Sequence, residues 1–261
     1  MSTKDPRLDS VQYPGGVEVV LNTHNDRLVK EYEHIINTTG AHNKKSPLTL
    51  YFGDRGVELR NTNKLHNNGQ RVDFLQIAIS ARNISKKQPL PKSIGSHKTV
   101  VDATAGFGMD SCRLALLGYK VVGIEQSPII STMLRDGLWR AKQHKQTAKL
   151  LADNLSFVEM DALEYLKNSS GAEVVYIDPM FPSKNKKNAL PPGHIQALQK
   201  VVGHANPTKT HNLFQAALAT ATSRVVIKRP THAPTMGQNP ISINEGKLVR
   251  YEVYKSQPNT H

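Results

Sequence analysis

The second half of the chain alternates short, β-branched runs with helical stretches, and this alternation constrains the fold more than any other feature. The runs cover residues 99–102, 121–125, 155–159, 173–178 and 224–228. Strands separated by helices favour a mainly parallel sheet with helices on both faces. A further run, 248–254, follows no strong helical pattern, so we expect it to lie antiparallel, at the sheet edge or between neighbours. The sequence therefore predicts an α/β fold.

The connection after residues 121–125 carries the clearest helical pattern. Ser127 is a typical N-cap, and Pro128 suits the first helical position. Apolar residues then recur at the helical period: Ile130, Met133, Leu134, Leu138 and Ala141. We expect a helix that starts at Pro128 and buries this stripe.

A smaller α+β region precedes this pattern. Residues 17–21, 48–52 and 57–60 have strand patterns, the last two joined across a glycine turn, and residues 71–82 have a helical one. Lysines, prolines and a glycine interrupt any periodic pattern between residues 85 and 98. We therefore expect a small N-terminal region over 1–95 and a larger domain over 96–261.

The charge of the chain favours a polyanionic partner. Of its 261 residues, 34 are Lys or Arg and 21 are Asp or Glu, so the formal net charge is +13. Each phosphate that a cation neutralises releases condensed counterions, which favours binding to nucleic acid. The plainer interpretation is that this charge serves solubility.

Other features bear on location and metal binding. No apolar run approaches the roughly 20 residues of a membrane span, and the first ten residues lack the apolar segment of a secretory signal. The single cysteine, Cys112, cannot form an internal disulfide, and we expect it in the core. Histidines without metal-ligand spacing predict no metal site. We expect a cytoplasmic protein with no membrane attachment.

Glycines and carboxylates follow the first two runs, where parallel sheets bind ligands. Asp102 begins a loop that contains Gly106 and Gly108, and Glu125 ends the next run. The glycines allow a sharp turn close to a ligand, and the Glu125 carboxylate can accept hydrogen bonds from both hydroxyls of a ribose. Together they predict a cofactor that contains a nucleoside, either a nicotinamide dinucleotide or S-adenosylmethionine.

The third run is followed by Met160-Asp161-Ala162. Asp161 can accept a hydrogen bond from an adenine amino group, with a backbone amide beside it, or it can cap a helix over 162–167. Both roles can hold at once.

The motif that separates the two cofactors is Asp178-Pro179-Met180-Phe181-Pro182, after the fourth run. Its prolines make a stiff loop that presents backbone carbonyls and an aromatic ring. Such a loop suits methylation of an exocyclic amine, because Asp178 and the Pro179 carbonyl can accept the hydrogens of the amine while Phe181 stacks on the base. Dehydrogenases do not need it, so the motif favours S-adenosylmethionine.

Cations follow the last two motifs. They are Lys184, Lys186 and Lys187 after the proline loop, and Lys228 and Arg229 after the fifth run. These side chains suit contacts to the phosphates of a nucleic acid whose base is extruded into the site. A solvated charged loop is the ordinary alternative.

Several of these segments resemble a known family, the bacterial 16S rRNA guanine-N2 methyltransferases called RsmJ. The similar segments are 101–110, 134–138, 174–182, 225–230 and the helix that begins with Arg71-Val72-Asp73-Phe74. The combination of the Asp178 motif with Lys228-Arg229-Pro230 is specific, whereas the glycine loop is shared widely among methyltransferases. The resemblance covers about residues 71–254.

The resemblance implies a seven-stranded Rossmann-like sheet with the last strand antiparallel, S-adenosylmethionine as the methyl donor, and guanosine 1516 of 16S rRNA in the small ribosomal subunit as the substrate. It also implies cofactor contacts at Met109, Asp110, Glu125, Gln126, Asp161, Ala162 and Asp178. The family usually has arginine where Met109 and Gln126 stand, and a Gly-Gly-Gly-Arg run at Ser85-Lys86-Lys87. These departures bear on cofactor affinity and on the shape of the RNA cleft.

Two alternatives stay open at this point. The same chemistry can act on another RNA base, on a DNA adenine or cytosine, or on a protein glutamine. The chain can also be a non-catalytic RNA-binding factor in ribosome assembly. The oligomeric state does not follow from the sequence.

Overall fold

The computed structural model describes residues 10–12, 17–39, 47–80, 84–169, 171–179, 201 and 206–257. The chain divides into two compact units. Unit 1 consists of Met1–Asp73, Ser127–Trp139 and Ser183–Gly203, and unit 2 consists of Phe74–Gln126, Arg140–Pro182 and His204–His261. These units are defined by contacts in space and do not follow the chain. The division into regions 1–95 and 96–261 stays a prediction.

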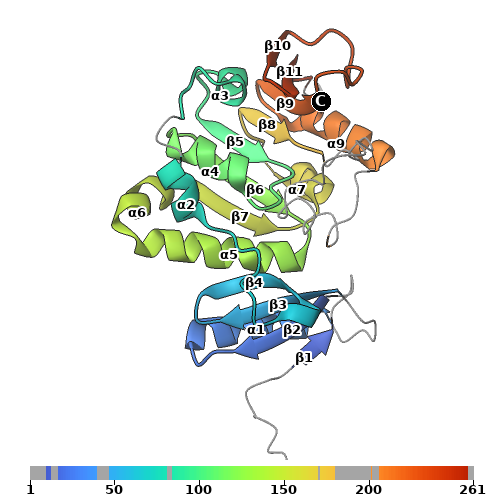
Figure 1. Ribbon diagram of the computed structural model, residues 1–261. Helices are drawn as coiled ribbons and strands as arrows, with labels where there is room; N and C mark the ends of the chain where they lie inside the picture. Colours follow the sequence, from blue (N-terminus) through green and yellow to red (C-terminus); the bar gives the residue numbers. More distant parts are fainter. Residues whose placement is uncertain are drawn as a thin grey trace, which may run out of the picture. The chain divides into compact units, whose positions relative to one another are not determined.

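Unit 2 is built on a seven-stranded sheet in the order β10-β11-β9-β8-β5-β6-β7 (Figure 1). The strands are β5 (Thr99–Asp102), β6 (Lys120–Glu125), β7 (Leu155–Glu159), β8 (Val174–Ile177), β9 (Arg224–Pro230), β10 (Ser242–Glu245) and β11 (Val249–Lys255). Strands β5 to β9 pair in parallel, whereas β11 is antiparallel to both β9 and β10. The expected α/β fold with a mixed sheet is confirmed, and β11 lies between two neighbours.

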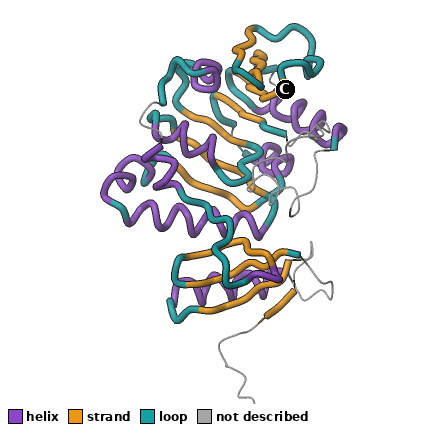
Figure 2. The backbone as a smooth tube through the Cα atoms, viewed as in Figure 1, coloured by secondary structure: helices purple, strands orange, loops and turns teal. Residues whose placement is uncertain are grey.

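Helices alternate with these strands along the chain (Figure 2). They are α2 (Phe74–Ser80), α3 (Pro89–Ile94), α4 (Met109–Leu116), α6 (Lys145–Leu151), α7 (Ala162–Asn168), α9 (Pro207–Thr220) and the end of α5 (Pro128–Gln143). On one face, Val175 and Ile177 of β8 pack with Phe214 of α9. Because side chains alternate along a strand, Tyr176 points to the opposite face, where its hydroxyl meets Asp110 of α4. No helix in the described residues is long and apolar enough to cross a membrane.

Two stretches of unit 2 differ from the sequence expectations. The helix expected over 71–82 begins only at Phe74. Gln70 forms a β-bridge with Leu59, and residues 71–73 between this bridge and the helix are not helical. The interrupted stretch after residue 85 contains α3. Pro89 starts this helix and Gly95, with a φ of 74°, ends it. The proline and glycine that suggested a boundary therefore mark the two ends of a helix.

Cys112 lies in the core of unit 2, as expected. Its side chain on α4 is completely buried. Burial raises the pKa of the thiol to about 12, since the thiolate would lose its hydration. The group is therefore protonated at neutral pH.

Unit 1 contains a four-stranded sheet in the order β1-β2-β3-β4. Its elements are β1 (Ser10–Gln12), β2 (Val17–Asn22), α1 (Asp26–Thr39), β3 (Leu48–Gly53), β4 (Gly56–Asn61) and the 3-10 helix η1 (Thr62–Lys64). The expected antiparallel pairing of β3 with β4 is confirmed. Strands β2 and β3 are parallel, so α1 forms the crossover between them and buries Leu28, Tyr32 and Ile35.

Helix α5 contributes its first turns to unit 1. It begins at Pro128 as expected, and the N–H of Ile130 donates to the Ser127 hydroxyl at 3.5 Å. Ile130, Met133 and Leu134 of the expected stripe are fully buried. The N-cap and the apolar period thus predicted this helix from local sequence.

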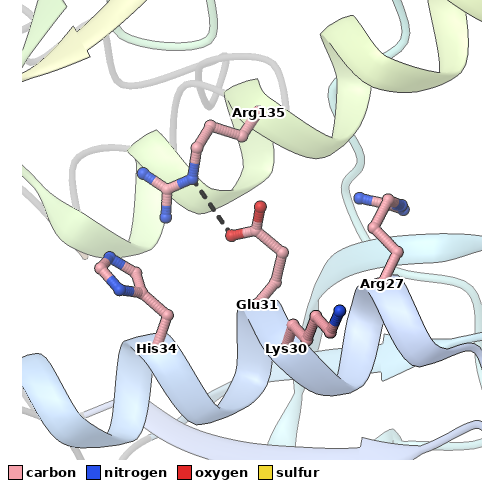
Figure 3. A pocket seen from close by; sticks show the side chains of 5 residues that line it. All are labelled: Arg27, Lys30, Glu31, His34 and Arg135. Atoms are coloured by element: carbon pink, nitrogen blue, oxygen red, sulfur yellow. Dashed lines mark hydrogen bonds and ion pairs between the residues drawn. The ribbon is translucent and has the colours of Figure 1, made fainter.

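Ion pairs join α5 to α1 within unit 1. Asp136 is fully buried and accepts hydrogen bonds from Arg27 at 2.5 Å and from the backbone N–H of Val57 at 3.0 Å. Arg135 pairs with Glu31 at 3.1 Å. A cavity of about 440 Å³ lies between the two helices (Figure 3), lined by Arg27, Lys30, Glu31, His34 and Arg135. Both arginines that line it are already paired with carboxylates.

Candidate functional site

The carboxyl ends of the parallel strands bring the predicted polar residues to one edge of the sheet in unit 2. The chain places Asp102, Glu125 and Asp178 at or just beyond the ends of β5, β6 and β8, and Lys228 within β9, shortly before that strand ends at Pro230. Residue Ile177 pairs with Ile227, so the next residues, Asp178 and Lys228, stand side by side. The structure therefore brings these predicted residues together at the carboxyl ends of the strands, and their functional roles stay predictions.

The glycine loop and Glu125 meet directly. Gly106 and Gly108 have φ values of 52° and 71°, in a region that a side chain disfavours, and Gly108 is the N-cap of α4. The N–H of Gly106 donates to Glu125 Oε2 at 3.1 Å. Only 6% of Glu125 is exposed. The loop thus holds this carboxylate at the carboxyl end of β6, and its expected contact with a ribose stays a prediction.

Asp102 stabilises the glycine loop through hydrogen bonds at both of its ends. It is 2% exposed and accepts hydrogen bonds from the Thr104 N–H and from the Ser111 hydroxyl of α4. Burial raises the pKa of its carboxyl to about 7, since the charged form is desolvated. Asp102 therefore ties the end of β5 to α4, and its expected contact with a cofactor stays a prediction.

A cluster of charges joins the ends of β8 and β9 to α4. The Lys228 ammonium donates to Asp178 Oδ2 at 2.8 Å and to Asp110 Oδ2 at 3.1 Å. Tyr176 donates its hydroxyl hydrogen to the same Asp110 oxygen at 2.8 Å. The N–H of Asp178 donates to the Thr104 hydroxyl at 2.6 Å, which fixes the backbone at the start of the motif.

The two acids of this cluster titrate differently. Burial, together with the nearby Asp110, raises the pKa of Asp178 to about 6, although Lys228 opposes the shift. Burial also acts on Asp110, but Lys228 and the Tyr176 hydroxyl outweigh it and hold the pKa of Asp110 below its usual value. Burial lowers the pKa of Lys228, yet the two carboxylates raise it above the ordinary value overall. Of these two acids, Asp178 is therefore the one that loses its charge more easily.

Asp161 has the second of its two predicted roles. Its side chain accepts hydrogen bonds from Leu163 at 2.9 Å and Glu164 at 3.2 Å, so it caps α7. The N–H of Met160 donates to the Glu125 carbonyl, which keeps the end of β7 beside that of β6. Asp161 stays exposed while it caps the helix, so both predicted roles remain compatible.

The remaining predicted residues fall into three groups. Met109, Ala162 and Gln126 follow strand ends as expected, the first two half-buried and the last exposed, and Pro179 is buried. Phe181, Lys184, Lys186 and Lys187 lie outside the described residues. Arg229 is 9% exposed and donates to the Pro234 carbonyl at 2.7 Å, while Lys228 faces Asp110 and Asp178. In this structure, neither of these two cations is presented on an open surface, and their phosphate contacts stay a prediction.

Sequence reasoning missed the aromatic hydroxyls of the site. Tyr176 lies within β8, and the sequence analysis assigned it no role beyond its place in the run 173–178. Tyr251 of β11 lies opposite Lys228 in the register, and burial raises the pKa of its hydroxyl to about 12. The signal that could have found Tyr176 is its alternation with the apolar Val175 and Ile177, which places it on the face of Asp178.

The balance of charge indicates what the site can bind. Asp110 and Asp178 pair with the Lys228 ammonium, and Arg113 also pairs with Asp110 from the half-exposed side. Asp102 and Glu125 add two further carboxylates at the ends of β5 and β6. An excess of carboxylates suits a positively charged ligand, and the glycine loop beside Glu125 suits a nucleoside. Among the described residues, no group of His, Cys, Asp or Glu is arranged to hold a metal ion.

Comparisons with known proteins agree with this chemistry. A family model described as "Putative SAM-dependent methyltransferase" matches residues 35–256. The chain is also similar to proteins named ribosomal RNA small subunit methyltransferase J. One from Haemophilus influenzae (strain PittGG) is 35% identical, and the match covers 82% of this chain and 85% of that protein. One from Aliivibrio fischeri is 33% identical, and the match covers 91% of this chain and 98% of that protein. The crystal structure of a SAM-dependent methyltransferase from Neisseria gonorrhoeae superposes with a TM-score of 0.64 at 28% identity, covering 83% of this chain and 86% of that one.

Proposed function

The chain belongs to this family of S-adenosylmethionine-dependent methyltransferases, and we propose that it methylates the exocyclic N2 amine of a guanosine in 16S rRNA. The proposed target is guanosine 1516 of the small ribosomal subunit. The names of the relatives support ribosomal RNA as the substrate, and the net charge of +13 favours a polyanion. The observation that carries the choice of an amine is the Asp178 carboxylate, which stands at the tip of β8 directly before Pro179.

The acids of the site fit the methyl donor. S-adenosylmethionine supplies a methyl group on a positively charged sulfur and carries a ribose diol, an adenine and an ammonium group. In this proposal, Glu125 accepts hydrogen bonds from the ribose hydroxyls, and Asp161 and the Ala162 amide contact the adenine. Asp110 adds negative charge for the cationic end, and Met109 and Gln126 complete the expected contacts. The excess of carboxylates is the match on which this assignment depends.

Asp178 and Pro179 orient the amine in the proposed reaction. The lone pair of a guanine N2 is delocalised into the ring, so the amine has to be turned before it can attack. The Asp178 carboxylate and the Pro179 carbonyl accept one amine hydrogen each, and Phe181 stacks on the base. The lone pair then faces the methyl carbon, and the new nitrogen–carbon bond forms as the sulfur–carbon bond breaks.

Asp178 also stabilises the charge that develops on the nitrogen. Once the methyl group has been transferred, the nitrogen carries a positive charge and loses one proton to solvent. A preorganised carboxylate next to this charge lowers the barrier without reorganisation at the moment of reaction. No separate general base is needed for the transfer itself.

The direct test is to identify the methylated nucleoside. Small-subunit RNA or particles that lack the modification are incubated with the protein and labelled S-adenosylmethionine, and the digested nucleosides are analysed by mass spectrometry. We expect N2-methylguanosine at position 1516. A labelled adenosine, a labelled cytidine or a methylated protein glutamine would replace the proposed substrate. Absence of S-adenosylmethionine binding in calorimetry would favour a non-catalytic RNA-binding role.

A further inference from the structure

We propose that Lys228 is a positioning residue for methyl transfer: its ammonium holds one oxygen of the Asp178 carboxylate so that the other oxygen faces the substrate amine. This inference rests on the proposed function. It gives Lys228 a role inside the site, where the sequence had suggested a contact with RNA phosphate.

The register of the sheet fixes the pair. Strands β8 and β9 are parallel and hydrogen-bonded, and Ile177 pairs with Ile227. Ile177 and Ile227 both pack on the α7 and α9 side. Because side chains alternate, Asp178 and Lys228 both turn to the α4 side. Their contact at 2.8 Å therefore follows from the pairing of neighbouring strands.

The two oxygens of Asp178 have different environments. Oδ2 accepts from Lys228, and the backbone N–H of the same residue is fixed by the Thr104 hydroxyl. Among the described residues, none donates a hydrogen bond to Oδ1. The side chain of Asp178 is 34% exposed, whereas that of Lys228 is 22% exposed. One oxygen is thus anchored and the other is available to an amine that enters the site.

Asp178 depends on Lys228 more than Asp110 does. Asp110 also accepts from Tyr176 at 2.8 Å and from Arg113 at 3.3 Å. Within the described residues, Lys228 is the only cation that pairs with Asp178. Removal of the ammonium therefore leaves Asp110 with two donors, and it leaves the partly buried Asp178 carboxylate without a cation among the described residues.

The charged groups around Asp178 set the direction of the effect. Asp110 on α4 and Asp102 at the end of β5 bring negative charge, Tyr176 and Tyr251 bring neutral hydroxyls, and Arg113 pairs with Asp110 at the half-exposed edge. Lys228 is the group that opposes burial and lowers the pKa of Asp178. Without it, the pKa of Asp178 rises from about 6 toward neutral pH or above.

The test compares Lys228→Met and Lys228→Arg with the matched control Lys120→Met. Lys120 is exposed and starts β6, at the opposite end of the sheet. Single-turnover methyl transfer is measured between pH 5.5 and 9 for each protein. For Lys228→Met we expect the rate at pH 7 to fall by at least about tenfold. We also expect the acidic limb of the pH–rate profile to lie at least about one pH unit higher than in the wild type. Lys228→Arg should keep the limb near its original pH, and Lys120→Met should be unchanged.

A second readout does not depend on activity. The carboxyl carbons of aspartate are labelled with ¹³C and titrated by NMR, and the Asp178 signal is assigned as the one absent from Asp178→Asn. We expect its midpoint to rise by about one unit or more in Lys228→Met. S-adenosylmethionine affinity, measured by calorimetry, should change less than about threefold, because Asp110 keeps its other donors.

Each result decides between positioning and another role. An unchanged Asp178 midpoint, an unchanged acidic limb, or a loss of donor affinity as large as the loss of rate would overturn the proposal. The outcome is separate from the identity of the base. If the wild type methylates an amine other than guanine N2, the proposed substrate fails while the shift of the acidic limb still tests Lys228.

Discussion

Carboxylates and cations meet in both units of the molecule, but the acids are balanced by cations in one unit and in excess in the other. In unit 1 each acid at the α1–α5 junction has its own arginine: Asp136 pairs with Arg27 and Glu31 with Arg135. In unit 2, Asp110 and Asp178 share Lys228, and Arg113 pairs only with Asp110. Asp102 is buried there without a cation among the described residues. Balanced pairs hold elements together, whereas an excess of one sign leaves a field for a ligand.

The difference teaches how to separate structural charge from functional charge. The buried acid of unit 1 has its hydrogen bonds filled by Arg27 and a backbone N–H, so nothing is left for a ligand. At the edge of the unit 2 sheet, Asp178 keeps one oxygen without a described donor. The same types of residue therefore serve stability in one unit and binding in the other. Substitutions should separate the two cases.

The largest effect is expected from Asp178→Asn. The amide cannot stabilise positive charge on the amine nitrogen, so we expect methyl transfer to fall by about 100-fold or more. The measurement is the single-turnover rate with labelled S-adenosylmethionine at pH 7.5. The exposed Asp153→Asn, on the same unit, is the control and should keep the wild-type rate. Equal rates in the two variants would remove the proposed mechanism.

Asp136→Ala should affect stability rather than donor binding. It leaves the Arg27 guanidinium and the Val57 N–H without their buried acceptor, so we expect the free energy of unfolding to fall by about 3 kcal/mol. Urea unfolding can be followed by the fluorescence of Trp139, the single tryptophan, whose ring lies 4.1 Å from the Arg27 guanidinium carbon.

The double variant Arg27→Met with Asp136→Leu is the partner experiment for this pair. Removal of both charges should recover part of the lost stability, because no uncompensated ion is left. S-adenosylmethionine affinity should stay the same in both variants. A loss of affinity parallel to the loss of stability would contradict the division of roles between the units.

Glu125→Gln should weaken the binding of S-adenosylmethionine without reducing the stability of the fold. The amide oxygen can still accept from the Gly106 N–H, but the charge that strengthens the ribose contact is gone. We expect calorimetry to show S-adenosylmethionine affinity reduced by about ten- to a hundredfold. The exposed Glu245→Gln on β10 is the control. Unchanged affinity would refute the ribose contact.

The smallest effect concerns Asp102 and pH. Its pKa is about 7 in the folded chain, above the ordinary value of 3.8, so the folded state binds the proton more tightly than the unfolded state. This carboxyl therefore contributes its stability fully below pH 4 and loses it as the pH rises to 7. Between these values, wild type should lose at least about 1 kcal/mol relative to Asp102→Asn, as measured by urea unfolding. If the free energy of unfolding depended on pH identically in the two proteins, the raised pKa of Asp102 would be refuted.

Local sequence was sufficient where an element depends on its own residues. Strands β5 and β7 have the predicted bounds, and α5 begins at the predicted proline. The acids at the strand ends were singled out because parallel sheets bind ligands at the carboxyl ends of their strands. Helix α1 was missed although Leu28, Tyr32 and Ile35 recur at the helical period, whereas β10 gives little signal because three of its four residues are exposed.

The contacts of the site could not be read in the same way. The Asp178–Lys228 pair joins residues 50 positions apart, and only the pairing of β8 with β9 brings them together. Lys228 and Arg229 look equivalent in sequence, yet alternation along β9 sends them to opposite faces. A motif shows which residue types are present, whereas register decides which of them face each other.

The buried Cys112 has a practical consequence for spectroscopy. A thiol that is inaccessible and protonated reacts poorly with maleimide or iodoacetamide reagents. A cysteine introduced at an exposed position, such as Leu248 of unit 2 or Asp54 of unit 1, would therefore be the only site labelled in the folded chain. Pairs of such labels can report the spacing of the two units with and without donor or RNA, without any need to replace the native cysteine.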